Sequence, residues 1–379
     1  MRSFTVTSVW GIPIKIHISL LVVLPIFAWL LGSGQQIELY AGLIEALTGA
    51  SLDVATLTAG STPWVIGFAA AIGLFVSVAL HELGHAWAAM RYGLDVESIT
   101  LWILGGLANL GPIPREWHKE FWIAVAGPAT SILVGAACYA GVTVLPASQP
   151  VVVFVAGWLA VTNVVLAVFN MVPAFPMDGG RVLRALLARN RPYASATRLA
   201  ASVGKGFAIL FGAAGLLGGF NPMLLLLALF IYGAASSESR TVVLADLLEG
   251  VTVADLTAAP DGTIDASASV SELVTRMFAD RRTEFAVVDG GDVVGVITSD
   301  DFRAVPPAER ETTTVAELMA TDLPTFDATT PAFDALIELD QSRASEAFVT
   351  TPEGTRMISR RDFASALEMR KVLGRGDPF

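Results

Sequence analysis

His81-Glu-Leu-Gly-His85 lies near the end of a largely apolar stretch that runs from Trp64 to Met90. In a helix, two histidines four residues apart lie one turn apart on the same face, where both rings can bind one Zn²⁺. Glu82 lies beside them and can act as a general base toward a metal-bound water. Charged groups at membrane depth cost at least about 2.5 kcal/mol each on insertion scales. Such a cluster inside one apolar span therefore indicates a functional site.

The composition divides the chain into two parts that suit different solvents. The 379 residues are 54% hydrophobic, with a mean hydropathy of +0.62, which is too apolar for an ordinary soluble domain. Residues 1–250 carry 12 Lys and Arg against 12 Asp and Glu, whereas residues 251–379 carry 12 against 23. We therefore predict a bilayer-embedded N-terminal part and an acidic, soluble C-terminal part. The acidity of this tail argues against nucleic-acid binding.

Six apolar segments have lengths near the roughly 20 residues that one transmembrane helix needs. They cover approximately residues 16–34, 64–90, 121–145, 151–172, 200–217 and 222–236. The loop 35–63 has no lysine or arginine, whereas basic residues precede the first segment, separate the second from the third and follow the fourth. By the positive-inside rule, this alternation places both termini in the cytoplasm. We expect an α-helical, multi-pass protein of the cell membrane with about six transmembrane helices.

The segment 92–118 does not read as a span. Its apolar run 99–104, followed by Gly105-Gly106, predicts one or two β-strands with a glycine break. An unpaired strand in lipid would leave its amides unsatisfied, so we expect this element to pair or to line a water-filled cavity. An extended substrate peptide is one candidate partner, joined to 99–104 by strand addition.

A catalytic zinc needs a third protein ligand and an open position for water. The remaining histidines, His17 and His118, read better as interfacial residues, so a carboxylate is the better candidate. The fourth span ends in Asn170-Met-Val-Pro-Ala-Phe-Pro-Met-Asp178-Gly-Gly-Arg181. Two prolines unwind a helix end, and two glycines permit close approach of another backbone. Asp178 is therefore the candidate ligand; a helix cap or a partner of Arg181 is the alternative reading.

Both motifs together carry a family resemblance. His81-Glu82-x-x-His85 with Asn170-x-x-Pro-x-x-x-x-Asp178-Gly-Gly resembles the site-2 protease family of intramembrane zinc metalloproteases. Ala126-Gly127-Pro128, the glycine pair at 105–106 and the six-span layout extend the resemblance over residues 1–240. One departure is Ala129-Thr130-Ser131, where the family often has an asparagine; we expect this departure to affect helix packing more than chemistry.

The resemblance implies a role for each matching residue. His81, His85 and Asp178 would bind one Zn²⁺, and Glu82 would be the base. Asn170, Gly105 and Gly106 would contact the substrate or the developing oxyanion. Family members cut a transmembrane helix of another membrane protein, in bacteria often a membrane-anchored transcriptional regulator. The expected partners are therefore a single-span membrane protein and membrane lipid.

The tail contains a duplicated β-α-β-β-α pattern. Over residues 250–370 it resembles a tandem pair of cystathionine-β-synthase (CBS) domains. The stretch from Gly295 to Asp301 resembles the family's Thr-x-x-Asp element, in which the acid contacts an adenosine ribose. The second copy, Ser359-Arg-Arg-Asp362, fits less well. The resemblance leaves two readings open: adenine nucleotide binding through Thr298, Asp301 and Asp362, or a purely structural pairing module. It also leads us to expect a homodimer through this region.

We therefore predict a transmembrane zinc metalloprotease domain at 1–245, a first CBS domain at 246–310 and a second at 311–379. If the tail binds adenine nucleotide, we expect the nucleotide to regulate the protease. Two alternatives remain: a CBS-gated metal transporter or channel, and a catalytically idle membrane protein that retains its partners. Glu82 distinguishes the protease from the transporter, because a hydrolase needs a base beside the metal ligands and a transport site does not.

Overall fold

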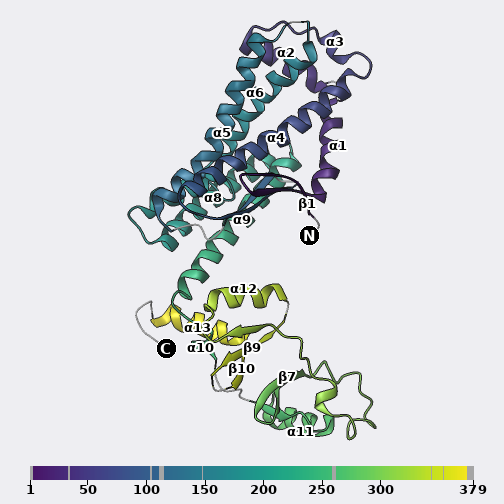
Figure 1. Cartoon of the computed structure of the whole chain (residues 1–379), viewed down its shortest axis with the longest axis vertical. Helices are drawn as coiled ribbons and strands as arrows, with labels where there is room; N and C mark the ends of the chain where they lie inside the picture. The colour runs from purple at the N-terminus through teal and green to yellow at the C-terminus, as the bar shows by residue number, and fades with distance from the viewer. Residues whose placement is uncertain are drawn as a thin grey trace. The chain divides into compact units, whose positions relative to one another are not determined.

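The computed structural model describes residues 3–32, 35–102, 105–110, 115–146, 148–257, 262–342, 344–352 and 354–373. Two compact units make up the chain, Met1–Arg240 and Thr241–Phe379. The first is mostly helical with one small sheet, and the second is an α/β module (Figure 1). Both features agree with the predicted fold class.

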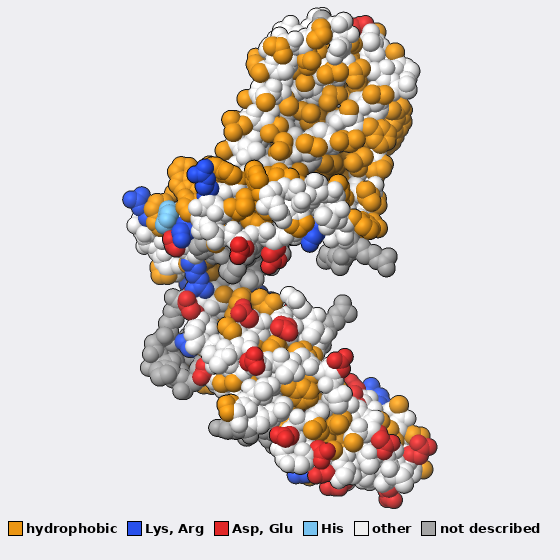
Figure 2. Space-filling view, viewed as in Figure 1, with side chains coloured by type: hydrophobic (Ala, Val, Ile, Leu, Met, Phe, Trp, Pro, Cys, Tyr) orange, Lys and Arg blue, Asp and Glu red, His pale blue; other side chains and the backbone are white. Residues whose placement is uncertain are grey.

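Five helices within the described residues are long and apolar enough to cross a membrane. They are α4 (Thr62–Arg91), α5 (Trp117–Val144), α6 (Pro150–Asn170), α8 (Tyr193–Leu217) and α9 (Pro222–Leu247). A sixth span results if α1 (Ile18–Gly32) and α2 (Gln35–Thr48), which form a bent pair, count as one. Hydrophobic side chains cover much of the visible face of this unit (Figure 2), as contact with lipid tails requires. The last two helices are longer than predicted.

The predicted loop 35–63 is largely helical, which corrects the sequence analysis. It contains α2 and the short α3 (Val54–Thr58). Ile37, Ile44 and Leu57 from these helices are fully buried and pack in one cluster with Trp158 of α6. The polar residues of α2 lower its average hydropathy, so it does not resemble a span. Its apolar positions nevertheless recur at helical spacing.

A four-stranded sheet lies beside α4, in the order β1 (Ser3–Val9), β2 (Ile12–His17), β3 (Val96–Trp102) and β4 (Gly105–Leu110). Strand β3 pairs in parallel with β2 and antiparallel with β4. Ile99 and Leu101 bury their side chains against Val78 and Ala86 of α4. The hairpin β1–β2 was not predicted. Because both edges of β3 are occupied, the prediction that 99–104 itself pairs with a substrate is wrong for the described residues 99–102; residues 103 and 104 lie outside the described part. Among the described residues, the two edge strands of this sheet are β1 and β4.

The chain turns sharply after α6. Residues 171–177 form turns, and α7 (Asp178–Ala188) begins at the predicted ligand. A Cβ on Gly179 would collide with the carbonyl oxygens of Met171 and Val172, and one on Gly180 would meet the backbone of Ala174. The glycine pair therefore allows α7 to fold back tightly against the end of α6.

The tail repeats one topology. Its sheets are β5 (Thr263–Asp265), β6 (Glu284–Asp289), β7 (Asp292–Thr298) and β8 (Thr325–Asp327), β9 (Glu346–Thr351), β10 (Gly354–Ser359). The helices are α10 (Val253–Leu256), α11 (Val270–Asp280), α12 (Ala332–Ser342) and α13 (Arg360–Leu373), with a 3₁₀ turn η1 (Val315–Glu317). In each sheet the first strand is parallel to the second and the second antiparallel to the third. The predicted duplication is thereby confirmed.

One helix of the tail was predicted wrongly. The first repeat was expected to end in a helix from Asp300, but residues 299–310 form turns. Pro306-Pro307 explains the difference, because proline removes a backbone donor and restricts the residue before it to extended conformations.

Candidate metal centre

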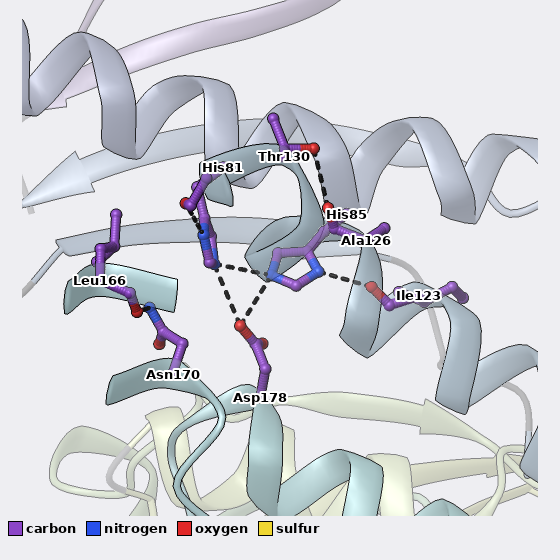
Figure 3. Close-up of polar contacts among 9 residues, drawn as sticks. His81, His85, Ile123, Ala126, Thr130, Leu166, Asn170 and Asp178 are labelled. Carbon is purple, nitrogen blue, oxygen red and sulfur yellow. Dashed lines mark hydrogen bonds and ion pairs between the residues drawn. The ribbon is translucent and has the colours of Figure 1, made fainter. Parts of the chain in front are cut away.

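Three buried side chains from two helices converge on one point. His81 and His85 lie on α4, and Asp178 is the first residue of α7. Oδ2 of Asp178 is 3.1 Å from Nε2 of His81 and 3.2 Å from Nε2 of His85, and the two Nε2 atoms are 3.2 Å apart (Figure 3). Ligands about 2.0–2.1 Å from a tetrahedral Zn²⁺ would be about 3.3 Å apart. Their number and spacing fit zinc with a fourth position left for water.

The other ring nitrogens hold both histidines in place. Nδ1 of His85 donates to the carbonyl oxygen of Ile123 at 2.7 Å, and Nδ1 of His81 lies 2.8 Å from Oγ of Ser131. Zinc-binding histidines commonly use such second contacts, which fix the tautomer and leave Nε2 free for the metal. Both partners lie on α5. Ser131 therefore contacts a predicted ligand directly, which corrects the assignment of the 129–131 departure to packing.

Two glycines let α4 and α5 approach closely at this point. A Cβ on Gly127 would collide with Nε2 of His85 and lie 2.7 Å from Nε2 of His81. On α4, a Cβ on Gly84 would collide with Oγ1 of Thr130 and lie 2.8 Å from the carbonyl oxygen of Ala126. The backbone of α5 thus passes directly beside the ligand rings, and the motif glycine between His81 and His85 is needed for that contact.

The predicted base lies beneath an edge strand. Glu82 follows His81 on α4 and is half-buried. A Cβ on Gly106 would collide with Cγ of Glu82 and lie 2.7 Å from its Oε1. Strand β4 therefore crosses immediately beside the carboxylate, and the predicted residues Gly105 and Gly106 belong to that strand.

Asn170 lies near the ligands but contacts its own helix. Its Nδ2 donates to the carbonyl oxygen of Leu166 at 3.0 Å, within the last turn of α6 (Figure 3). Among the hydrogen bonds of the described residues, none joins Asn170 to His81, His85 or Asp178. The structure thus brings Asn170 into the neighbourhood of the predicted site without giving it a bond there.

The two remaining histidines lie outside this cluster. Nδ1 of His17 accepts from the backbone amide of Ser19 at 3.2 Å and is 2.8 Å from its hydroxyl, at the start of α1. His118 is exposed and lies 3.7 Å from Glu116.

A buried charge cluster next to the centre was not predicted from the sequence. Arg184, on α7, donates from Nε to Oε1 of Glu120 at 2.7 Å and from Nη1 to Oε1 of Glu238 at 2.5 Å. The arginine side chain is only 2% exposed. The signal was present in part: Glu120 lies in the first turn of α5, and Glu238 is the first charged residue of α9 after an apolar run.

A cavity of about 790 Å³ lies between the two repeats of the tail. Its lining includes Ser359 and Asp362 from the second repeat and Glu284 from the first. Oδ2 of Asp362 accepts from the amide and hydroxyl of Ser359 at 2.7 and 2.8 Å. Asp301 makes the same pair of bonds with Thr298, but these two residues do not line this cavity. The two motifs thus form the same turn, and only the second faces the cavity.

Both basic and acidic side chains line this cavity. Four arginines line it, at positions 281, 282, 360 and 361. Burial raises the pKa of the Glu284 carboxyl above its usual value, Asp362 adds to this effect, and Arg361 opposes it.

An HExxH helix, a distant aspartate placed to complete a metal site and several membrane-length helices are typical of a multi-pass membrane zinc metalloprotease. The chain belongs to peptidase family M50, whose model matches residues 69–151 and 146–211, and a CBS domain model matches residues 253–307. A zinc metalloprotease of Methanocaldococcus jannaschii is 31% identical over 332 residues, which cover 84% of this chain and 87% of that protein.

Two further comparisons identify similar proteins. The Mycobacterium tuberculosis protein named Rip3 is 33% identical over 325 residues, covering 81% of this chain and 77% of its own length. The solved structure of the site-2 protease from Methanocaldococcus jannaschii is 33% identical and matches with a TM-score of 0.42, covering 63% of this chain and 96% of that one.

Proposed function

We propose that this protein hydrolyses a peptide bond within the transmembrane segment of a single-span membrane protein, such as a membrane-anchored transcriptional regulator. In this proposal it acts in the cell membrane with both termini in the cytoplasm. The observation that carries it is the convergence of His81, His85 and Asp178 beside Glu82, with both histidines on α4, a helix that is long and apolar enough to span a bilayer.

Each residue then has a defined task. Bound Zn²⁺ would supply Lewis acidity and lower the pKa of its water to about 7. Glu82 accepts a proton from the attacking water and delivers it to the leaving amide nitrogen. His81, His85 and Asp178 would hold the ion, and Ser131 and the carbonyl of Ile123 keep the two imidazoles oriented through Nδ1. Asn170 would turn its amide toward the developing oxyanion, once substrate competes with its bond to Leu166.

The free edge of β4 suits an unwound substrate. A transmembrane helix must open before hydrolysis, because its amides are already hydrogen-bonded and shielded. An edge strand offers unpaired backbone groups to such a segment. Gly105 and Gly106 begin β4, and Gly106 abuts Glu82. A peptide paired with β4 would therefore run beside the base, and main-chain pairing would limit the selectivity for side chains.

The tail is proposed to regulate the protease by binding adenine nucleotide. The division into domains 1–245, 246–310 and 311–379 is part of this proposal, as is a homodimer through the two tail domains. Its support is the cavity between the repeats, where Asp362 can meet a ribose and arginines can meet phosphates. Thr298 and Asp301 would form the equivalent element of the first repeat. Nucleotide can regulate only if two arrangements of the tail bind it with different affinity.

One experiment tests the protease proposal and separates it from its alternatives. Wild type and Glu82→Gln are purified in nanodiscs, and zinc content, cleavage of a tagged single-span protein and the effect of ATP or AMP are measured. We expect both forms to hold zinc, whereas Glu82→Gln loses at least about 10²-fold in cleavage rate. Metal uptake into vesicles by Glu82→Gln, with no cleavage by either form, would indicate a transporter. Substrate retention without cleavage by wild type would indicate an idle binding protein.

A further inference from the structure

The buried cluster around Arg184 joins three helices. Arg184 lies on α7, six residues after Asp178. It bonds to Glu120 near the start of α5 and to Glu238 on α9. Its guanidinium carbon also lies 5.0 Å from the ring centre of Phe175, in the turn that precedes α7. The arginine therefore holds the helix that begins with a metal ligand.

The two carboxylates of this cluster are not equivalent. The side chains of Arg184 and Glu120 are both 2% exposed, and together they carry no net charge. The side chain of Glu238 is 38% exposed. A buried charge that loses its partner is strongly destabilising, whereas an exposed one can return to water. Glu120 is thus the permanent partner of Arg184, and Glu238 is the partner that can leave.

Each residue of the Arg184–Glu120 pair lies on a helix that also contributes to the metal centre. Glu120 lies three residues before Ile123, whose carbonyl oxygen holds Nδ1 of His85. On the other side, the six residues from Asp178 to Arg184 span about 9 Å of helix. A shift of Arg184 along the axis of α7 would therefore move Asp178 relative to His81 and His85.

Helix α9 connects this cluster to the tail. It runs without a break from Pro222 to Leu247, and the next residue, Leu248, is 2% exposed within the core of the second repeat. Glu238 lies nine residues before the end of this helix. The core of the tail thus holds the end of the helix that carries Glu238.

We propose that Glu238 is a positioning residue for Asp178. It holds α7 through Arg184, and α9 transmits a rearrangement of the tail to the metal centre by this contact. This inference rests on the proposed function only in that the tail rearrangement would regulate a protease. The effect of Glu238 on metal binding can be measured without a substrate.

The test compares Glu238→Gln with Glu116→Gln in the full chain in nanodiscs. Glu116 is a matched control, because it also sits in an ion pair, with Lys119 at 2.7 Å, but is 54% exposed and does not touch Arg184. Zinc affinity is measured by competition with a chromophoric chelator, and hydrogen exchange of residues 178–188 in metal-free protein. We expect Glu238→Gln to bind zinc about tenfold more weakly, the low end for outer partners of metal ligands, and to exchange faster in α7. Glu116→Gln should match wild type in both.

Each outcome bears on one part of the inference. A lower thermal midpoint for Glu238→Gln, with unchanged zinc affinity and exchange, would show a merely stabilising ion pair and overturn the positioning role. For the tail, ATP or AMP should alter zinc affinity in wild type and have little effect in Glu238→Gln. An equal response in both forms, or no response in wild type, overturns the transmission through α9. Loss of affinity in Glu238→Gln without any cleavage by wild type would contradict the protease proposal alone.

Discussion

Replacing Gly127 by alanine should disrupt the metal centre with the smallest possible change. The new methyl group would collide with Nε2 of His85, lie 2.5 Å from its Cε1 and lie 2.7 Å from Nε2 of His81. These ring atoms are the ones that face the metal position. The substitution therefore places a carbon atom where the predicted ligands converge. The backbones of α4 and α5 are already in close contact at Gly84, so a shift of α5 cannot easily relieve the collision.

The size of the effect follows from the geometry. Ordinary contact begins near 3.4 Å, so Nε2 of His81 would have to move by about 0.7 Å and His85 by more. Both rings are tied through Nδ1, one to Ser131 and the other to Ile123. A misplacement of about 1 Å at a reacting centre can cost about 10²-fold in rate. We expect Gly127→Ala to lose at least that factor in cleavage and to bind zinc at least about tenfold more weakly.

A matched control exists on the same helix. Gly141 has nothing within 4 Å of the position its Cβ would take, and Gly→Ala in a helix interior is favourable by about 0.5–1 kcal/mol. Both variants are assayed in nanodiscs for zinc by chelator competition and for cleavage of a tagged single-span protein. Gly141→Ala should match wild type. Wild-type zinc affinity and cleavage in Gly127→Ala would refute the assignment of His81 and His85 as ligands at this position.

Two other substitutions probe separate features. Ser131→Ala removes the partner of His81 at Nδ1, so zinc affinity should fall about 10- to 100-fold while folding persists. Ser131→Thr, which keeps a hydroxyl, should recover part of the lost affinity. Equal zinc affinity in wild type, Ser131→Ala and Ser131→Thr would contradict the role of Ser131. In the tail, the raised pKa of Glu284 means that burial favours its neutral form, so its stabilising effect is complete below its unfolded pKa and is lost as pH rises through the higher folded pKa. Glu284→Gln should therefore raise the thermal midpoint at pH 7, and the difference should vanish below about pH 4; a variant that is less stable than wild type at pH 7 would show that the attraction of Arg361 dominates instead.

The predictions that succeeded rest on residues whose chemistry is visible in the sequence. Two histidines at helical spacing and a carboxylate between prolines and glycines are rare in apolar segments, and His81, His85 and Asp178 do converge. The duplication of the tail was readable for a similar reason, because alternating apolar strands differ sharply from the spans before them. These features depend on local sequence patterns, which can be recognised without knowledge of the tertiary packing.

The missed features depend on contacts between distant segments. Gly127 acts through the side chain it lacks, so its role emerges only when α5 lies against α4. Arg184 followed a span and was counted as a topology signal, although its side chain is buried between Glu120 and Glu238. The pairing of β3 with β2 brings together residues about eighty positions apart, and nothing local to 99–104 indicates that both its edges are occupied.

A single face of α5 supports the metal centre. Glu120, Ile123, Gly127 and Ser131 are spaced by three, four and four residues, which places them in one stripe along the helix. In order, they hold Arg184, accept from His85, make room for both ligand rings and contact His81. None of the four is a metal ligand, yet each fixes one element of the site relative to α5. The predicted ligands come from α4 and α7, so we infer that α5 sets their mutual distances. Substitutions along this stripe should therefore change metal affinity, whereas residues on the opposite face of α5 should change it little, and a zinc-affinity scan along 117–144 would reveal that period.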